Sequence, residues 1–278
     1  SARAAATQYV RALVVALRGT IEDVEFAFDD ERAVAALQAT LKTGSTEDAL
    51  VALQILGDHT PASLSPMFVE LIGHDSSEVR RAALERIEAH QPSGLAANLR
   101  ARLKVEQDDT VRALTLRALS AVEGASSRDA LMPYVNSSVL ALREAAILGL
   151  RRIGAVEGAA ALRSLSESAD PTSRLAAGRL LRVQGDRGDL PILVALINDE
   201  DVRVSRLALS AAGQTNEPEL IAMMIQRATR PGVLGAARAG LAAAGDGALP
   251  LMIGAFEKDR GTEKRRGLKE RPWIYADG

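Results

Sequence analysis

The stretch DSSEVRRAALERI, residues 75–87, sets the pattern on which the chain is built. A short polar turn is followed by a Val-Arg pair and then by small and aliphatic residues at helical spacing. Altered copies begin at Asp108, Asn136, Asp170 and Asp199. The arginines that align in these copies are Arg80, Arg112, Arg143, Arg174 and Arg203. A period near thirty residues with two helical segments predicts an all-α fold, a right-handed α-solenoid superhelix of about seven to eight antiparallel helix pairs.

The predicted helix pairs follow one another from residue 30 to residue 259. Their ranges are 30–42 with 45–57, 61–73 with 76–90, 92–106 with 109–122, 126–135 with 138–153, 156–168 with 171–184, 188–197 with 201–212, and 217–229 with 231–244. A further first helix is expected at 246–259. The chain is therefore predicted to form a single repeat array over 1–278.

Local signals keep the same phase as the repeat. A Leu-Pro signal marks the start of four first helices, where the missing proline amide would have no acceptor. These prolines are Pro66, Pro133, Pro191 and Pro250. Glycines are expected to end four second helices. They are Gly154, Gly185, Gly213 and Gly245. Ser45 and Asp48 are spaced as a capping box.

The two ends of the chain depart from the repeat. Residues 1–29 contain an amphipathic helix at 3–28, which we expect to cover the first repeat; a partner-binding helix is the alternative. Residues 260–278 form a C-terminal tail or cap. As a cap, Trp273, Ile274 and Tyr275 would fold back over the last repeat; an aromatic and basic binding segment is the alternative. A start at Ser1 without Met favours a processed or excised piece.

The composition of the chain argues against several classes of function. The net charge of −2 gives no basic surplus for coating DNA or RNA, so we expect no nucleic-acid partner. Without cysteine, the chain has no disulfide or thiolate chemistry. No run of eighteen apolar residues occurs, so we expect no membrane insertion of this segment and a cytoplasmic location. Only five of the 34 basic residues are lysines, which reflects either codon bias or arginines chosen for ion-pair ladders.

The Leu-Pro helix, the Asp-containing turn and the Val-Arg that opens an Ala/Leu helix resemble HEAT repeats, most closely the short bacterial variety related to phycobilisome-lyase repeats. The resemblance covers about 30–259. It implies a structural ladder between turn aspartates and second-helix arginines. The aspartates it assigns are Asp75, Asp108 or Asp109, Asp170 and Asp199, with the five aligned arginines as partners. A weaker resemblance, carried by YVRALVVAL near the N-terminus, is to HEAT regions fused to nucleotide-carrier-like bacterial transporters.

Catalytic patterns were not found. His59, His74 and His90 fall at helix ends or turns, and none precedes a glutamate as in iron-binding HEAT hydroxylases. No glycine-rich phosphate loop and no serine elbow occurs. We therefore expect no enzyme activity, no catalytic or metal site and no cofactor.

Binding is the remaining function. In HEAT superhelices the second helices line the concave surface, which the resemblance transfers to this chain. Candidate partner-binding residues there are Arg81, Arg117, Arg151, Arg179 and Arg182, with Glu85 and Glu144 beside them. The hypothesis is a non-catalytic protein–protein interaction scaffold that takes an acidic protein segment, either extended or helical. An ordinary solvated helix face is the alternative interpretation. The alternative functions are a soluble regulatory domain of a larger bacterial membrane transporter and a cofactor-holding lyase or chaperone-like HEAT protein.

Overall fold

The computed structural model describes residues 41, 45–56, 65–228, 232–255 and 257. The predicted capping helix at 3–28 and the predicted tail or cap at 260–278 lie outside these residues, as does nearly all of the predicted helix 30–42. The described residues contain helices and no strand, which confirms the all-α prediction. By its contacts the chain divides into two compact units, Ser1–Ala159 (unit 1) and Ala160–Gly278 (unit 2). The single array over 1–278 stays a prediction.

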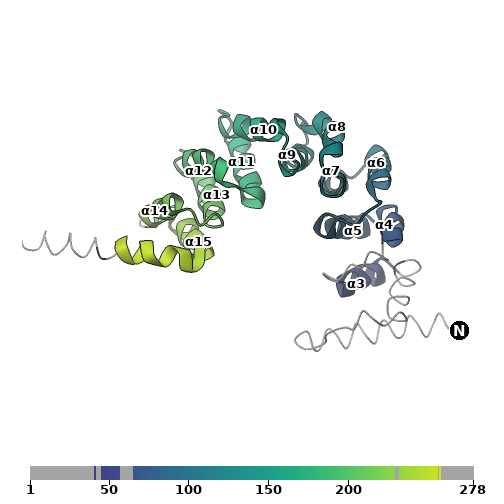
Figure 1. The fold of residues 1–278 in the computed structure, drawn as a ribbon, viewed down its shortest axis with the longest axis horizontal. Helices are drawn as coiled ribbons and strands as arrows, with labels where there is room; N and C mark the ends of the chain where they lie inside the picture. Colours follow the sequence, from purple (N-terminus) through teal and green to yellow (C-terminus); the bar gives the residue numbers. More distant parts are fainter. Residues whose placement is uncertain (1–40, 42–44, 57–64, 229–231, 256, 258–278) are drawn as a thin grey trace, which may run out of the picture. The chain divides into compact units, whose positions relative to one another are not determined.

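Unit 1 is a succession of helical hairpins whose second helices pack side by side (Figure 1). Helix α5 packs against α7, and α7 packs against α9. The helices are α3 (Thr46–Leu56), α4 (Ser65–Ile72), α5 (Ser77–His90), α6 (Ala96–Val105), α7 (Asp109–Glu123), α8 (Arg128–Leu131) and α9 (Leu140–Arg152). Helix α10 (Val156–Ser166) spans the division between the units.

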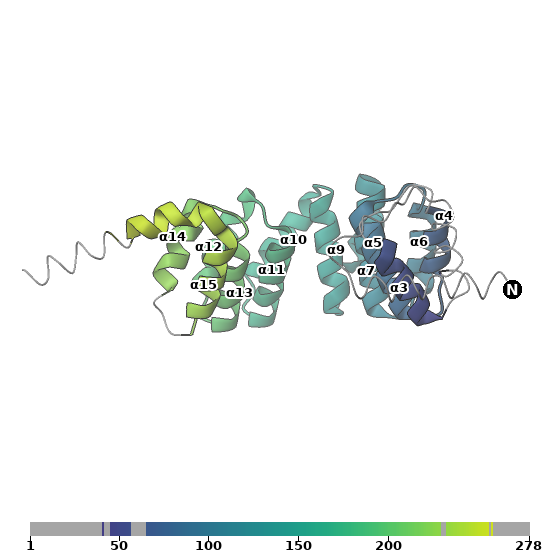
Figure 2. The ribbon, with the colours of Figure 1, turned by 90° about the horizontal axis from the view of Figure 1, so that it is seen from below.

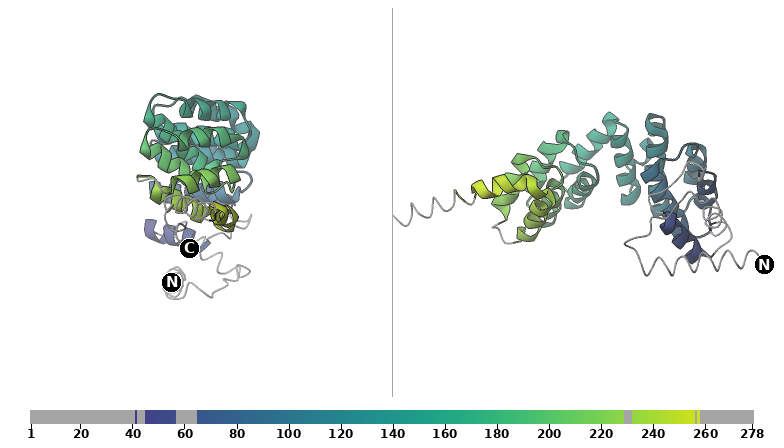
Figure 3. Two further views of the ribbon diagram at one scale, coloured as in Figure 1. Left: turned by 90° about the vertical axis from the view of Figure 1, so that its left-hand side faces the viewer. Right: turned by 60° about the horizontal axis from the view of Figure 1, so that its bottom comes forward.

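Unit 2 repeats this arrangement. Helix α11 packs against α13, and α13 packs against α15; the three lie side by side in Figure 2. The helices are α11 (Pro171–Gln184), α12 (Leu190–Ile197), α13 (Val202–Ala212), α14 (Pro218–Arg227) and α15 (Leu234–Ala244), followed by helical residues 249–255. The views in Figure 3 show the same order of helices. Sequential packing within each unit is consistent with an α-solenoid, while its handedness and the number of pairs stay predictions.

The core of each unit consists of apolar side chains that second helices share with both neighbours. Val79, Leu84 and Ile87 of α5 and Leu119 of α7 are fully buried in one cluster. Burying a Leu or Ile side chain contributes about 1.5–3 kcal/mol, so these shared contacts outweigh any single polar interaction.

The second helices begin where turn carboxylates accept orphan amides. Asp108 accepts hydrogen bonds from the amides of Thr110 (2.8 Å) and Val111 (3.1 Å), and Asp170 caps α11 in the same way. Ser45 and Asp48 form the predicted capping box, since each side chain accepts a hydrogen bond from the other residue's amide at 3.2 Å. Local sequence thus fixes the helix starts.

The prediction of one continuous helix over residues 126–135 is wrong. The segment is divided into a 3₁₀ turn (Gly124–Ser127), the short α8 and a second 3₁₀ turn (Met132–Tyr134). Pro133 lies in the first turn of this last piece and so does not start the first helix of the pair. Pro191, in contrast, lies in the first turn of α12 as predicted.

Two glycines allow α13 and α15 to approach closely. A Cβ atom at Gly213 would lie 2.3 Å from the carbonyl oxygen of Gly240. A Cβ atom at Gly240 would lie 2.5 Å from both the Leu209 carbonyl oxygen and the Met224 sulfur. Gly213 has φ −61°, so it is required for space and not for a left-handed helix end. By contrast, Gly154 (φ 72°) and Gly245 (φ 56°) have the positive φ values that favour glycine.

Gly240→Ala should lower the free energy of unfolding by about 1–3 kcal/mol, because the added methyl group meets a backbone carbonyl that cannot move without separating α13 from α15. Gly235→Ala on the same helix is the control. Its Cβ would meet nothing within 4 Å, so replacing this helical glycine should raise the stability by about 0.5–1 kcal/mol. Urea denaturation of both variants measures the difference; equal effects would contradict the close approach.

Candidate functional site

The second helices present one side on which the predicted binding residues lie. Residues five, nine and twelve positions after the N-cap are separated by helical steps of four and three, so they share this side, which we call the second-helix face. In unit 1 the face carries Arg81, Glu85, Glu88, Ala113, Arg117, Ser120, Glu144, Leu148 and Arg151. In unit 2 it carries Leu175, Arg179, Arg182, Arg206, Ser210, Gly213, Arg238, Ala242 and Gly245.

A ladder of arginines joins the hairpins away from this face. Arg80 donates from Nε to Glu106 Oε2 (2.8 Å) and from Nη2 to Glu106 Oε1 (3.1 Å). Its Nη1 donates to the carbonyl oxygens of His74 and Asp75, both at 2.8 Å. A fork of this kind satisfies one carboxylate and two carbonyls at once. Arg80 therefore ties the start of α5 to the turn before α7.

Unit 2 contains the same ladder contact. Arg174 donates from Nε to Asp199 Oδ2 (2.6 Å) and from Nη2 to Asp199 Oδ1 (2.9 Å). Its Nη1 donates to the carbonyl oxygens of Ser168 and Ala169, both at 3.0 Å. In both units the carboxylate stands two residues before the N-cap of the following second helix. Asp199 was predicted in a turn of the ladder, whereas Glu106 was not.

Two of the three remaining predicted ladder arginines, Arg112 and Arg203, pair with acids of their own helix starts. Arg112 pairs with Asp109 of its own helix and lies 5.6 Å from the centre of the Tyr134 ring. Arg203 pairs with its own N-cap, Asp201, and Ser205 stands at the ladder position of α13, where it donates to the Ile197 carbonyl oxygen at 2.7 Å. The alignment of Arg203 with the ladder was wrong by two residues.

Asp75, Asp108 and Asp170 also depart from the expected ladder. Arg80 contacts the backbone carbonyl of Asp75 and not its carboxylate. Asp108 and Asp170 accept hydrogen bonds from the first-turn amides of α7 and α11. Asp108 and Asp170 therefore start helices, and the carboxylates of the ladder are Glu106 and Asp199, each two residues before an N-cap.

The Glu106 carboxylate is the most strongly bound acid in unit 1. Burial would raise its pKa, but hydrogen bonds from the Asp108 amide, Arg102 and Arg80 lower the pKa to about 2. For Asp199, burial likewise raises the pKa, and the hydrogen bonds of Arg174 and the Asp201 amide lower it below its usual value. Both carboxylates are therefore held in the charged form that the ladder requires.

On the second-helix face of unit 1, charges neutralise one another. Glu88 of α5 accepts hydrogen bonds from Arg117 of α7 and from Arg152 of α9, with N–O distances of 2.8 and 2.5 Å. The Glu88 side chain is only 10 % exposed. Glu88 thus joins three helices, and Arg117, predicted as a partner-binding residue, is paired with it within the fold. Arg81 lies exposed on α5 and Arg151 lies half-buried on α9.

The second-helix face of unit 2 is basic. Helices α11, α13 and α15 contain arginines and no acidic residue. Two of these arginines are paired with acids at helix starts, Arg174 with Asp199 and Arg203 with Asp201. The second-helix face carries the other four, namely Arg179, Arg182, Arg206 and Arg238.

Three of the four face arginines are exposed: Arg182, Arg206 and Arg238; Arg179 is half-buried. Arg206 donates a hydrogen bond to the Gly232 carbonyl oxygen. Within the described ranges no acidic side chain forms an ion pair with Arg182, Arg206 or Arg238. Sequence reasoning named Arg179 and Arg182 but missed Arg206 and Arg238, which lie five residues after their N-caps, as Arg81 does.

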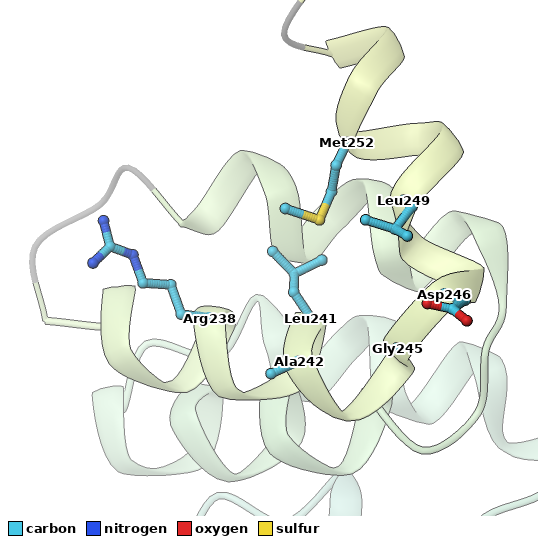
Figure 4. Close-up of a pocket in the computed structure, with 7 residues that line it drawn as sticks. All are labelled: Arg238, Leu241, Ala242, Gly245, Asp246, Leu249 and Met252. Carbon is cyan, nitrogen blue, oxygen red and sulfur yellow. The ribbon is translucent and has the colours of Figure 1, made fainter.

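An apolar recess lies beside Arg238 at the end of unit 2 (Figure 4). Its volume is about 380 Å³, and Leu241, Leu249 and Met252 point into it. Leu249 is 50 % exposed and Met252 is 41 % exposed, so the apolar side chains that follow α15 are not covered by the described residues.

The described residues lack a metal-binding cluster and a membrane-spanning helix. The described part of the chain holds no group of three or more His, Cys, Asp or Glu side chains that could bind a metal ion. His74 accepts a hydrogen bond from the Ser76 amide at 3.0 Å, which makes it part of a turn. No helix among the described residues has the length and apolar character needed to cross a membrane.

Residues 33–120 match the family model for HEAT repeats, and the helical hairpins on either side of residue 120 are consistent with a HEAT-repeat solenoid. HEAT repeats generally mediate protein–protein interaction, and proteins built from them are typically non-enzymatic scaffolds. No curated protein matches the chain.

Glu106→Gln should lower the free energy of unfolding at neutral pH by roughly 3 kcal/mol, because it leaves Arg80 buried without its charged partner. The folded pKa of about 2 lies below the usual value of 4.5, so the stability from this carboxylate is present above pH 4.5 and is lost as the pH falls toward 2. The variant should lack this acid-dependent loss. Glu157→Gln, which breaks the pair with exposed Arg128, is the control and should change the stability far less than Glu106→Gln does.

Arg174→Met should destabilise the chain far more than Arg203→Met, because Arg174 is the ladder residue and Arg203 is not. The Arg174 side chain is 11 % exposed, whereas that of Arg203 is 68 % exposed. We expect the loss for Arg174→Met to be several-fold larger than that for Arg203→Met. Thermal unfolding of the two variants measures both losses. A larger loss for Arg203→Met would support the original alignment of Arg203 with the ladder arginines.

Proposed function

We propose that the chain is a non-catalytic interaction scaffold that binds a protein partner on its second-helix face. The observation that carries this proposal is the row of exposed arginines on α11, α13 and α15, which faces no acid on those helices. An arginine fork binds a carboxylate with two parallel hydrogen bonds, so such a row is suited to acidic side chains of another protein.

The contrast with unit 1 supports this proposal. There the face carries three acids beside its three arginines, and Glu88 already binds Arg117. Charges that are used within the fold are not available to a partner. The proposed contact therefore uses mainly the exposed Arg182, Arg206 and Arg238, with Arg179 beside them, while Arg81 is the exposed candidate in unit 1.

A protein partner is favoured over a nucleic acid by the charge of the whole chain. The net charge is −2, and nucleic-acid binding draws most of its affinity from neutralised phosphates. A local basic row within a slightly acidic chain instead favours a partner with a local acidic segment.

Charge reversal on the second helices should abolish capture of the partner. Arg81→Glu with Arg182→Glu changes two exposed residues, and the matched control reverses Lys104 of α6 and Arg163 of α10, which are exposed on first helices. The measurement is quantitative affinity capture from the native source with the wild-type chain and both variants. A protein retained by the wild-type chain and the control but lost with the second-helix variant is expected.

Equal loss with both variants, or no loss with either, would contradict binding on the second-helix face. Circular dichroism of both variants should match that of the wild-type chain, because none of the four side chains forms an ion pair among the described residues.

A further inference from the structure

The arrangement of charge and apolar surface in unit 2 defines what kind of segment can bind there. Arg206 and Arg238 occupy the same position on neighbouring helices, five residues after the N-caps Asp201 and Val233. On α11 the same position is Leu175, and Arg179 and Arg182 lie further along that helix, nine and twelve residues after its N-cap. The pair of Arg206 and Arg238 therefore lies across two helices and not along one of them.

The distance between the helices sets the spacing of the charges. Packed helices lie about 8–10 Å apart, and an extended chain advances about 3.3 Å per residue. One step across the face thus corresponds to about three residues of an extended segment. An α-helix advances about 1.5 Å per residue and would need a step of six to seven residues. Acids three residues apart in an extended segment would therefore meet Arg206 on α13 and Arg238 on α15.

The recess extends the row beyond Arg238. Arg238 lines one side of it, and Leu241 follows one turn later on α15 (Figure 4). Leu249 and Met252 enter from residues 249–255. Methionine adapts to differently shaped apolar groups, and a half-exposed leucine gains free energy when it is covered. A large apolar side chain next to the acid that meets Arg238 would fill this recess.

We propose that unit 2 recognises an extended acidic segment of another protein, with an acid at about every third residue and a large apolar residue beyond the acid that binds Arg238. This inference rests on the proposed scaffold function and names the class of partner. Recognition comes from the register of the acids and the apolar end together, so net negative charge alone is not sufficient.

Synthetic labelled peptides test the register with the full 278-residue chain. The first peptide carries glutamates at every third position and a terminal leucine. A second has the same composition with its glutamates adjacent, and a third replaces the leucine with serine. By fluorescence anisotropy we expect the first peptide to bind about tenfold more tightly than either of the others, since several exposed charge pairs and one buried apolar group contribute.

Variants locate the contact on the protein. Arg206→Gln with Arg238→Gln should remove the preference for spaced glutamates, and Met252→Ser should remove only the preference for leucine. Lys104→Gln, on an exposed site of α6, is the control and should bind as the wild-type chain does. A reciprocal swap, Arg206→Glu with a lysine at the matching peptide position, should recover part of the lost affinity.

Equal affinity for the spaced and the adjacent glutamates would overturn the proposal, because it would show attraction by net charge alone. Tighter binding of a single-stranded oligonucleotide than of the first peptide would overturn it as well. The scaffold function is judged separately: a partner captured equally by the wild-type chain and the Arg206→Gln, Arg238→Gln variant would leave that function standing and remove this inference.

Discussion

A helical hairpin of this chain buries its apolar side only against the hairpins before and after it. Helix α7 shows the constraint, since it packs against α5 on one side and α9 on the other, and most of its residues from Val111 to Ser120 are buried. The repeat pattern contains small residues because neighbouring helices must pack closely on both sides. Where α13 meets α15, even a methyl group is too large, and Gly213 and Gly240 stand at the contact. The apolar contact sets the helix spacing, and the polar groups adapt to it.

The arginine ladder is one such adaptation. Arg80 reaches Glu106 and Arg174 reaches Asp199, over sequence separations of 26 and 25 residues. The bond joins an arginine in the first turn of one second helix to the residue two positions before the next N-cap. Because both bonded side chains are nearly buried, the pair contributes more to fixing the order of hairpins than an exposed pair would. Ser205 shows that a hydroxyl bound to a carbonyl can occupy the same place.

Much of the fold could be predicted from residue periodicity, because Asp108, Asp170 and Pro171 start helices through local interactions. The segment 126–135 could not, since whether Pro133 begins a helix or interrupts one depends on packing. The ladder acid Glu106 was missed because its role is defined by a residue 26 positions away. The site was predicted in part: Arg179 and Arg182 lie on the second-helix face. Aligning Arg203 with Arg80 displaced the register of α13 by two residues, and this hid Arg206 beside Arg238.

The contact of Glu88 with both Arg117 and Arg152 has a consequence for cooperativity. Its carboxylate joins α5 to α9, which are not neighbours in the succession of second helices, across a sequence separation of 64 residues. Repeat proteins are commonly described by the intrinsic stability of each repeat and a coupling between adjacent repeats. Here a third coupling links hairpins that are two apart. Fraying of α5 or of α9 must therefore break an ion pair to this carboxylate, so the contact couples α5 directly to α9 in addition to the couplings of adjacent hairpins.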